Sequence, residues 1–311
     1  MAEFVHQPVM SREVVELLAP VPPGLIVDAT VGGGGHARLV LEARADVDLL
    51  GIDRDPDAVA AARQALDGFG RRARVVRGGF EDLADIVSTE SEGNIVGILF
   101  DLGLSSPQVD RPERGFSYWA DAPLDMRMDS AQELTAEQVL NTYSEEDLAH
   151  IIATNGEERF ARRIARAIVA ARPMYTSAEL VNAVRAGIPA AARRRGRHPA
   201  RRTFQAIRME VNRELPNLAE GLDESVHVLT PGGRILVVAY HSLEDRLVKR
   251  RFLSWAGRDD VAPPGMPEPK RRNPLVRLLT RRPRRPASDE VAANPRAASA
   301  RLRAAERLPT Q

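Results

Sequence analysis

The segment Asp28-Ala-Thr-Val-Gly-Gly-Gly-Gly-His36 decides the fold of this chain. It follows the short apolar run Leu25–Val27 and precedes Ala37–Ala43, which has the apolar spacing of a helix. This order predicts a strand, a glycine-rich turn and a helix start, where backbone N–H groups face a bound ligand. A second strand-like run ends in Asp53, where an acid can accept hydrogen bonds from ribose hydroxyls. The segment therefore predicts a site for a nucleoside-containing cofactor.

Strand and helix patterns alternate through the first hundred residues and return after residue 230. Helices are expected over Pro56–Leu66 and Leu243–Trp255, and Pro231-Gly232-Gly233 is expected to form a turn before a strand. The expected strands are Leu25–Asp28, Asp48–Asp53, Arg74–Arg77, Ile95–Asp101, Arg234–Tyr240, Leu275–Leu279 and Ala300–Arg307. Such alternation indicates an α/β fold with a parallel sheet and right-handed crossovers.

The alternation stops between residues 110 and 215, where the apolar spacing is helical throughout. We therefore expect an α/β domain split into residues 1–109 and 216–311, with a helical domain, 110–215, inserted between the two parts. Residues 261–286 are rich in proline and arginine and are expected to form an exposed basic loop.

Two helices of the insert can be placed from their patterns. Residues 157–170 put Phe160, Ile164 and Ile168 on one side and four arginines on the other, which predicts a basic amphipathic helix. The next helix is expected to be capped by Thr203. Its expected buried residues are Phe204, Ile207, Val211 and Leu215.

The composition limits the function mainly through the absence of cysteine. Hydrophobic content of 43% and charged content of 28% are ordinary for a soluble globular protein. No secretory signal or membrane-length apolar run is visible, so we expect a cytoplasmic protein with no membrane partner. The chain has no cysteine, which excludes thiolate metal sites, iron–sulfur clusters and every cysteine nucleophile.

Basic residues gather in two segments although the net charge is only +1. Residues 185–208 contain eight arginines and no acid, and residues 270–285 contain eight basic residues and no acid. Such segments are either solvated faces or surfaces that dock on a folded polyanion, and the sequence leaves both interpretations open.

The remaining motifs carry a family resemblance. They run in order along almost the whole chain: His6–Met10, Asp28–His36, Gly51–Pro56, Asp101-Leu-Gly-Leu-Ser-Ser-Pro-Gln108, Arg114–Ser117, Pro123–Met128, Gly156–Phe160, His198–Gln205, His241-Ser-Leu-Glu-Asp-Arg246 and Asn294–Arg296. In these motifs the chain resembles the RsmH (MraW) family of 16S rRNA (cytosine-N4)-methyltransferases. The four consecutive glycines and the proline- and arginine-rich segment depart from the family's usual pattern.

The resemblance implies a class I methyltransferase sheet and S-adenosyl-L-methionine as the cofactor, with no metal. Gly34, Gly35 and His36 would contact its methionine part and Asp53 its ribose. Phe80 and Asp101 would border the adenine, with Gln108 near the reacting end; by chemistry alone, Phe80 is equally well a core aromatic residue.

The resemblance also implies that the chain methylates the exocyclic N4 of a decoding-region cytidine. Without cysteine, the reaction must be direct displacement on the methyl group, helped by an acceptor for the amino protons. Asp101 and Ser106 are the candidates for this role, Ser106 because its turn resembles the loop of DNA amino-methyltransferases. Six residues are candidates for binding the RNA: Arg193, Arg194, Arg195, Arg202, His241 and Ser242. A structural role for the histidine is the alternative.

The implied partner is 16S rRNA, presented by the small ribosomal subunit, and an apolar face on the insert would allow a homodimer. Three other functions remain open. The chain could be a DNA cytosine-N4 or adenine-N6 methyltransferase, a nicotinamide-dependent oxidoreductase, or a ribosome assembly factor that keeps the fold without turnover.

Overall fold

The computed structural model describes residues 8–104, 108, 111–193, 198–258 and 273–309. The chain divides into two compact units. Met1–Gly103 and Leu215–Gln311 form the first, called the sheet unit here, and Leu104–Glu214 form the second, called the helical unit. The insertion follows the fourth strand and begins a few residues before the position 110 that the apolar spacing indicates.

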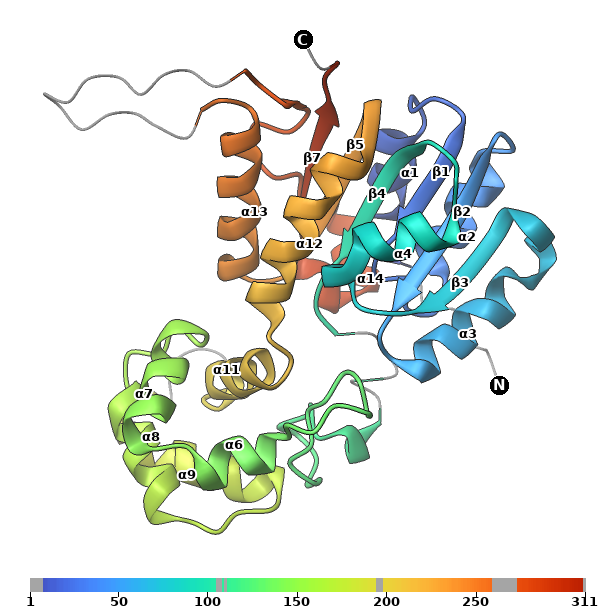
Figure 1. The fold of residues 1–311 in the computed structure, drawn as a ribbon. Helices are drawn as coiled ribbons and strands as arrows, with labels where there is room; N and C mark the ends of the chain where they lie inside the picture. Colours follow the sequence, from blue (N-terminus) through green and yellow to red (C-terminus); the bar gives the residue numbers. More distant parts are fainter. Residues whose placement is uncertain (1–7, 105–107, 109–110, 194–197, 259–272, 310–311) are drawn as a thin grey trace, which may run out of the picture. The chain divides into compact units, whose positions relative to one another are not determined.

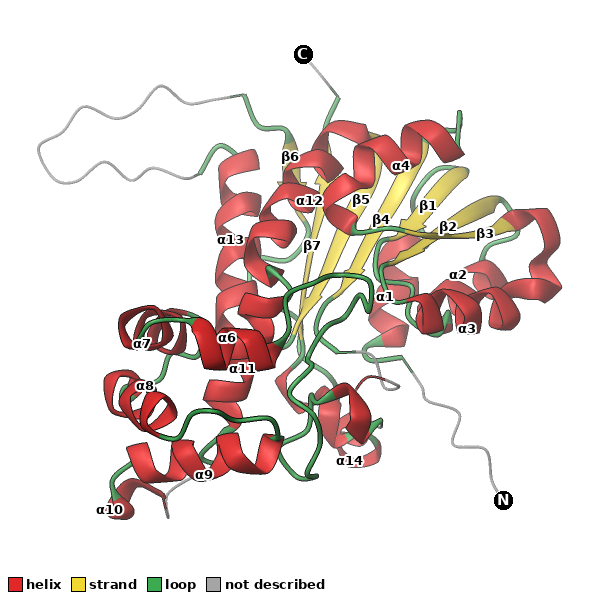
Figure 2. Ribbon diagram, turned by 60° about the horizontal axis from the view of Figure 1, so that its bottom comes forward, coloured by secondary structure: helices red, strands yellow, loops and turns green. Residues whose placement is uncertain are grey.

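The sheet unit contains a seven-stranded sheet with the order β3-β2-β1-β4-β5-β7-β6. Neighbours among β1 to β5 run parallel, whereas β7 is antiparallel to both β5 and β6. The strands are β1 (Gly24–Asp28), β2 (Val47–Asp53), β3 (Ala73–Arg77), β4 (Ile95–Asp101), β5 (Leu229–Ala239), β6 (Val276–Leu278) and β7 (Arg301–Arg307). The predicted α/β fold is confirmed, and Figure 2 shows the sheet with helices packed against it.

Helices cover both faces of this sheet, because successive apolar side chains of its strands point to opposite faces and both sets must be buried. Leu25 and Val27 of β1 belong to a core that includes α4, α12 and α13, whereas Ile26 packs with α1. Figure 1 shows α4 and α12 lying across one face. The helices of this part are α1 (Ser11–Leu18), α2 (Gly35–Ala43), α3 (Pro56–Leu66), α4 (Leu83–Glu90), α12 (Glu214–Val228), α13 (Ser242–Trp255) and α14 (Ser288–Ala293).

The helical unit has its own hydrophobic core, built from short helices. These are α6 (Ala136–Thr142), α7 (Glu145–Thr154), α8 (Ala161–Ala170), α9 (Ser177–Gly187), α10 (Ala190–Arg193) and α11 (Arg201–Val211). On α8, Ile164 and Ile168 are buried while Arg162 and Arg166 are exposed, so a basic amphipathic helix is present, although it begins at Ala161 rather than at residue 157. Among the described helices of both units, none is long and apolar enough to cross a membrane.

The expectation that residues 110–215 are helical throughout is wrong at their start. Between residues 111 and 135 the described chain forms only the short 3-10 turn η3 (Pro112–Arg114) and the bridge between Pro123 and Thr176. Several apolar residues of this segment are buried, and Leu124 and Met126 are fully so. Their spacing therefore reflects burial in an irregular segment rather than a helix.

The predicted cap of α11 is also wrong. The helix begins after Ala200, and Thr203 lies inside it with a buried hydroxyl that makes no hydrogen bond. The helix ends at Val211, because Asn212 leaves the helical conformation and donates from its side chain to the Met126 carbonyl. Leu215 belongs to α12.

Two expectations in the C-terminal part need correction. Pro231-Gly232-Gly233 does not precede β5 but lies within it, where the pairing with β4 shifts register and Gly232 adopts a φ of 83°. The segment 261–286 is not a single loop, because it contains β6. Residues 261–272, the first part of the predicted loop, lie outside the described part of the chain.

Candidate functional site

The carboxyl ends of the parallel strands place four polar side chains at one edge of the sheet. Asp28 ends β1, Asp53 ends β2 and Asp101 ends β4, while Tyr240 follows β5 directly. In the register between β4 and β5, Asp101 is opposite Val238, which brings Tyr240 to the same edge. Asp53, Asp101 and the glycine turn are sequence-predicted site residues, and they do meet within the sheet unit.

The glycine turn connects this edge to the first turn of α2. Gly34, the residue before the helix, has a φ of 81°, a conformation that glycine adopts without a Cβ penalty. Its N–H donates to the Val31 carbonyl over 2.7 Å. A Cβ atom placed on Gly33 would have no neighbour within 4 Å, so the turn has open space on that side.

Asp53 fastens the glycine turn to the end of β2. One carboxylate oxygen accepts the Gly32 N–H over 2.9 Å, and the other accepts the Asp55 N–H over 2.9 Å. Burial raises the pKa of Asp53, although both backbone hydrogen bonds act against the rise. The carboxylate predicted to contact a ribose therefore also sets the shape of the turn.

His36 is buried, and the position of one ring hydrogen follows from its contacts. Its Nε2 lies 2.9 Å from the Val9 carbonyl oxygen, which can only accept, so Nε2 carries a hydrogen. Its Nδ1 lies 3.5 Å from a carboxylate oxygen of Asp101. The ring is thus held between the chain before α1 and the end of β4.

Asp101 has a second, half-buried partner that sequence reasoning missed. The Tyr240 hydroxyl donates to its carboxylate over 2.8 Å, and the Asp101 N–H donates to the Thr30 hydroxyl over 2.6 Å. Burial raises the pKa of Tyr240 well above its usual value, so the phenol remains a donor at neutral pH. The signal that could have found Tyr240 is its position at the end of the strand paired with β4.

Asp28 is the most deeply buried of the three acids, with 2% of its surface exposed. Burial raises its pKa to about 7, and the charges of Asp101 and Asp53 act in the same direction, while His36 and the Thr30 N–H oppose them. Carboxylates that disfavour one another's ionisation are stabilised by a nearby cation. The sheet edge therefore fits a positively charged ligand.

Phe80 lies at the start of the 3-10 turn η2 (Phe80–Asp82), after β3. Its ring meets the buried Phe100 edge to face, with centroids 5.7 Å apart, and the Arg54 guanidinium lies 5.6 Å from its centroid. Arg54 is held there by Glu81, whose carboxylate it reaches over 2.8 Å. These contacts give Phe80 a packing role. The residue is only half-buried, and the predicted contact with adenine stays a prediction.

His241 is the N-cap of α13. Its Nδ1 accepts from the Glu244 N–H over 3.4 Å, and the Glu244 carboxylate accepts the N–H groups of His241 and Tyr240. A structural role for His241, the alternative to base binding, therefore has a defined form: it caps the N-terminus of α13. Ser242 follows as the first, half-buried residue of the helix.

The other predicted residues belong to the helical unit. Gln108 is buried, with 5% of its surface exposed. Arg202 is exposed at the start of α11, where it donates to the Glu157 carbonyl over 3.0 Å. Arg193 ends α10, but its side chain, like the whole of Ser106, Arg194 and Arg195, lies outside the described part of the chain.

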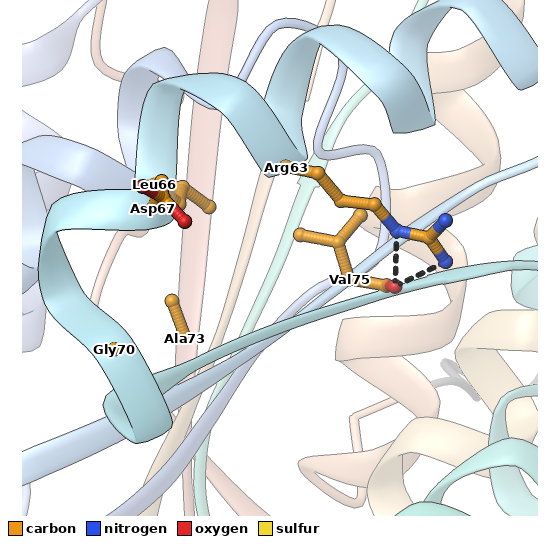
Figure 3. Close-up of a pocket in the computed structure, with 6 residues that line it drawn as sticks. All are labelled: Arg63, Leu66, Asp67, Gly70, Ala73 and Val75. Atoms are coloured by element: carbon orange, nitrogen blue, oxygen red, sulfur yellow. Dashed lines mark hydrogen bonds between the residues drawn. The ribbon is translucent and has the colours of Figure 1, made fainter.

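The sheet unit also has a hollow away from this site, and it contains none of the predicted site residues. It lies between the end of α3 and β3, and Figure 3 shows the Arg63 guanidinium turned onto the Val75 carbonyl. Arg63 donates to that carbonyl through two nitrogens, over 3.1 and 2.9 Å. The hollow is lined by Arg63, Leu66, Asp67, Gly70, Ala73 and Val75, and none of these is a predicted site residue.

Comparison with known proteins gives matches along almost the whole chain. The MraW methylase family matches residues 3–308. The ribosomal RNA small subunit methyltransferase H of Acidothermus cellulolyticus is 52% identical over 311 residues, covering 98% of this chain and 94% of the relative. Proteins of the same name from Thermobifida fusca and Symbiobacterium thermophilum are 50% and 49% identical, covering 97% and 98% of this chain and 93% and 97% of the relatives.

Proposed function

The chain belongs to the MraW methylase family, and from this premise we propose that it methylates the exocyclic N4 of a decoding-region (P-site) cytidine in 16S rRNA. Membership makes the chain a methyltransferase with S-adenosyl-L-methionine as its methyl donor, the cofactor that the sequence predicts. The match over residues 3–308 carries the proposal, together with relatives that are named for the RNA of the small ribosomal subunit.

The residues of the sheet edge fit this cofactor. S-adenosyl-L-methionine carries a sulfonium and an amino group, and the acids Asp28 and Asp101 supply the negative surroundings that such a cation needs. We propose that Gly34, Gly35 and His36 hold the methionine part and that Asp53 accepts from the ribose hydroxyls. Space beside Gly33 supports a ligand at the turn, since a Cβ atom there would meet nothing within 4 Å.

The proposed reaction is a direct displacement. When bound, the cofactor supplies a methyl group on sulfur, so that the bond from carbon to N4 forms as the bond from carbon to sulfur breaks. The N4 lone pair is conjugated with the ring, and an acceptor for the amino hydrogens makes it available. Asp101 is suited to accept the proton that N4 loses, because Tyr240 fixes one carboxylate oxygen and the side chain is 23% exposed. Ser106 shares this proposed role.

The helical unit is the proposed RNA-binding part. N4 lies on the Watson–Crick edge of cytosine, so the target base must be unpaired or flipped before methyl transfer. We propose that the arginines at 193–195 and Arg202 contact phosphates, with His241 and Ser242 beside the target base. The exposed arginines of α8 support an RNA surface on this unit, since RNA helices are recognised largely by shape and charge.

The test is methyl transfer from labelled S-adenosyl-L-methionine to purified small ribosomal subunits that lack the modification. Nucleoside mass spectrometry should find N4-methylated cytidine, at one position of 16S rRNA. Free 16S rRNA and duplex DNA serve as parallel substrates. Label on another base or atom would overturn the N4 assignment, and transfer to DNA alone would favour the DNA methyltransferase alternative. Tight cofactor binding without transfer to any substrate would favour the assembly-factor alternative.

A further inference from the structure

Trp119 is exposed to an unusual degree for a tryptophan. Its side chain is 77% exposed, whereas Trp255, the other tryptophan of the chain, is 8% exposed in the core of the sheet unit. Among the described residues, Tyr175 is the other large hydrophobic side chain on the surface, at 54%. A single exposed hydrophobic residue needs no explanation by itself, so the surroundings of Trp119 decide its meaning.

Three aromatic rings of the helical unit lie against one another around Trp119. The Tyr118 ring stacks on His198, with centroids 4.7 Å apart and planes 13° from parallel. The Trp119 ring lies 4.8 Å from His198 and 5.4 Å from Tyr118. We call Tyr118, Trp119 and His198 the aromatic platform. Its members come from segments that are about eighty residues apart in the sequence.

The platform is held by a buried aromatic residue and by hydrogen bonds of the loop that carries Trp119. Tyr118 meets the buried Phe204 of α11 edge to face, with centroids 5.7 Å apart. The Trp119 N–H donates to the Ser117 hydroxyl over 3.1 Å. Just beyond, the Ser177 hydroxyl accepts the Ala122 N–H over 3.0 Å. The loop that carries Trp119 is therefore held in place although the indole itself is in solvent.

A cation, Arg185, lies near the platform. Partial burial and, to a smaller extent, the nearby Arg185 lower the pKa of His198, so its ring is neutral at neutral pH and stacks as an uncharged aromatic. The arginines at 193, 194, 195 and 197 directly precede His198 in the sequence. Flat uncharged rings beside cations match the two parts of a nucleotide, a base with a π-face and a phosphate.

We propose that the aromatic platform binds an unpaired nucleobase of the RNA substrate, which stacks on the exposed indole of Trp119. This inference rests on the proposed function and adds a contact to it that none of the predicted site residues provides. A second copy of this chain is the other conceivable occupant. Arg185 beside the platform favours the nucleic acid, since two copies would bring this cation close to its own counterpart.

The first experiment uses the fluorescence of Trp119. The Trp255→Phe variant leaves Trp119 as the sole tryptophan, and its emission should be that of an indole in water. Titration with a single-stranded RNA oligonucleotide containing the decoding-region cytidine should quench this emission. A fully paired RNA duplex of the same length should quench it much less, because its bases are not free to stack. Equal quenching by both RNAs, or none by either under conditions where the RNA binds, would overturn the proposal.

The second experiment compares affinities in the full chain. Trp119→Ala should weaken binding of the same oligonucleotide by about 5- to 100-fold, the usual effect of removing one stacked base contact. The dependence of log K on log salt should keep its slope, because no charge is removed. Tyr175→Ala is the matched control, since it removes the other exposed aromatic residue of the helical unit, and it should bind like the unchanged protein.

The outcomes separate this proposal from the proposed function. If the unchanged protein methylates small subunits and Trp119→Ala binds RNA and methylates equally well, the platform is not a base-binding site but the function stands. If Trp119→Ala instead alters the mass found by sedimentation and leaves RNA affinity unchanged, the platform contacts a second copy of the chain, which overturns the proposal. If the unchanged protein binds the oligonucleotide through Trp119 but methylates no RNA, the proposed function fails and the base contact stands.

Discussion

The two units hold their candidate residues in opposite ways. At the edge of the sheet unit, Asp28 is almost fully buried and Asp101 is held by Tyr240 and the Thr30 hydroxyl. In the helical unit, Trp119 and Arg202 are exposed, and the packing that supports them lies beneath. In a polar network, the loss of one side chain disturbs the protonation and position of the others. Exposed side chains that do not touch one another contribute independently.

The two arrangements determine what a substitution in each unit will change. A change at the sheet edge should alter the protein even in the absence of ligand, since the acids interact directly. A change on the surface of the helical unit should alter binding and leave the fold as it is. The predictions below test this contrast, starting from the largest expected effect.

The largest effect is expected from Asp101→Asn, which keeps the shape of the side chain but removes its charge. If Asp101 accepts the N4 proton, kcat should fall by about 100- to 10,000-fold. Single-turnover methylation of small subunits gives the rate, and calorimetry gives the affinity for S-adenosyl-L-methionine. Tyr240→Phe is the control. It removes the phenol that donates to Asp101 while keeping the carboxylate, so it separates the loss of this hydrogen bond from the loss of the charge. Loss of cofactor binding in Asp101→Asn, without a separate fall in turnover, would argue against a chemical role for Asp101.

The next effect concerns stability without ligand. The folded pKa of Asp28 is raised from 3.8 to about 7, so its stabilising contribution is complete below pH 3.8 and is lost as the pH rises through 7. Asp28→Asn should therefore raise the free energy of unfolding above pH 7 by up to about 4 kcal/mol and by little near pH 4. Urea unfolding of both proteins at pH 4.5, 6 and 8 measures the difference. A difference that stays constant with pH would show that Asp28 ionises normally.

The smallest effect is expected on the exposed side of the comparison. Glutamine in place of the three arginines at 193–195 should weaken RNA binding and lower the salt slope by about 0.7 per phosphate contact removed. Glutamine in place of Arg12, Arg71 and Arg250, three exposed arginines of the sheet unit outside both basic segments, removes the same charge elsewhere. Equal loss of affinity in the two triple variants would mean that net charge matters rather than the location of the arginines. Thermal melting should show both variants as stable as the unchanged protein.

The sequence predicted the sheet edge well because its signals are local. The strand Ile95–Asp101 and the helix Pro56–Leu66 were predicted with the bounds that the structure has, and the acids follow from the strand ends. The partners of those acids could not be predicted in the same way. The contact between Tyr240 and Asp101 depends on the register of β5 against β4, and that register includes a shift within Pro231–Gly233.

The helical unit was harder to predict because its contacts join distant segments. Phe116, Leu124 and Met126 are buried in a segment that is not helical, so the apolar spacing there was misread as that of a helix. The aromatic platform stacks Tyr118 on His198, a pairing that no local pattern reports. For the arginines at 193–195, the expectation of an RNA contact stays a prediction from charge alone.

The position of β7 has a consequence for the order in which the protein is made. β7 lies between β5 and β6, so the sheet has a gap beside β5 until residues 301–307 have been synthesised. The helical unit is one continuous stretch of chain, Leu104–Glu214, and has all its residues long before then. On a translating ribosome the inserted unit can therefore fold first, while the sheet that carries the acids waits for its sixth strand in spatial order. A nascent chain would present the proposed RNA-binding surface before the sheet that carries the proposed catalytic acids is complete.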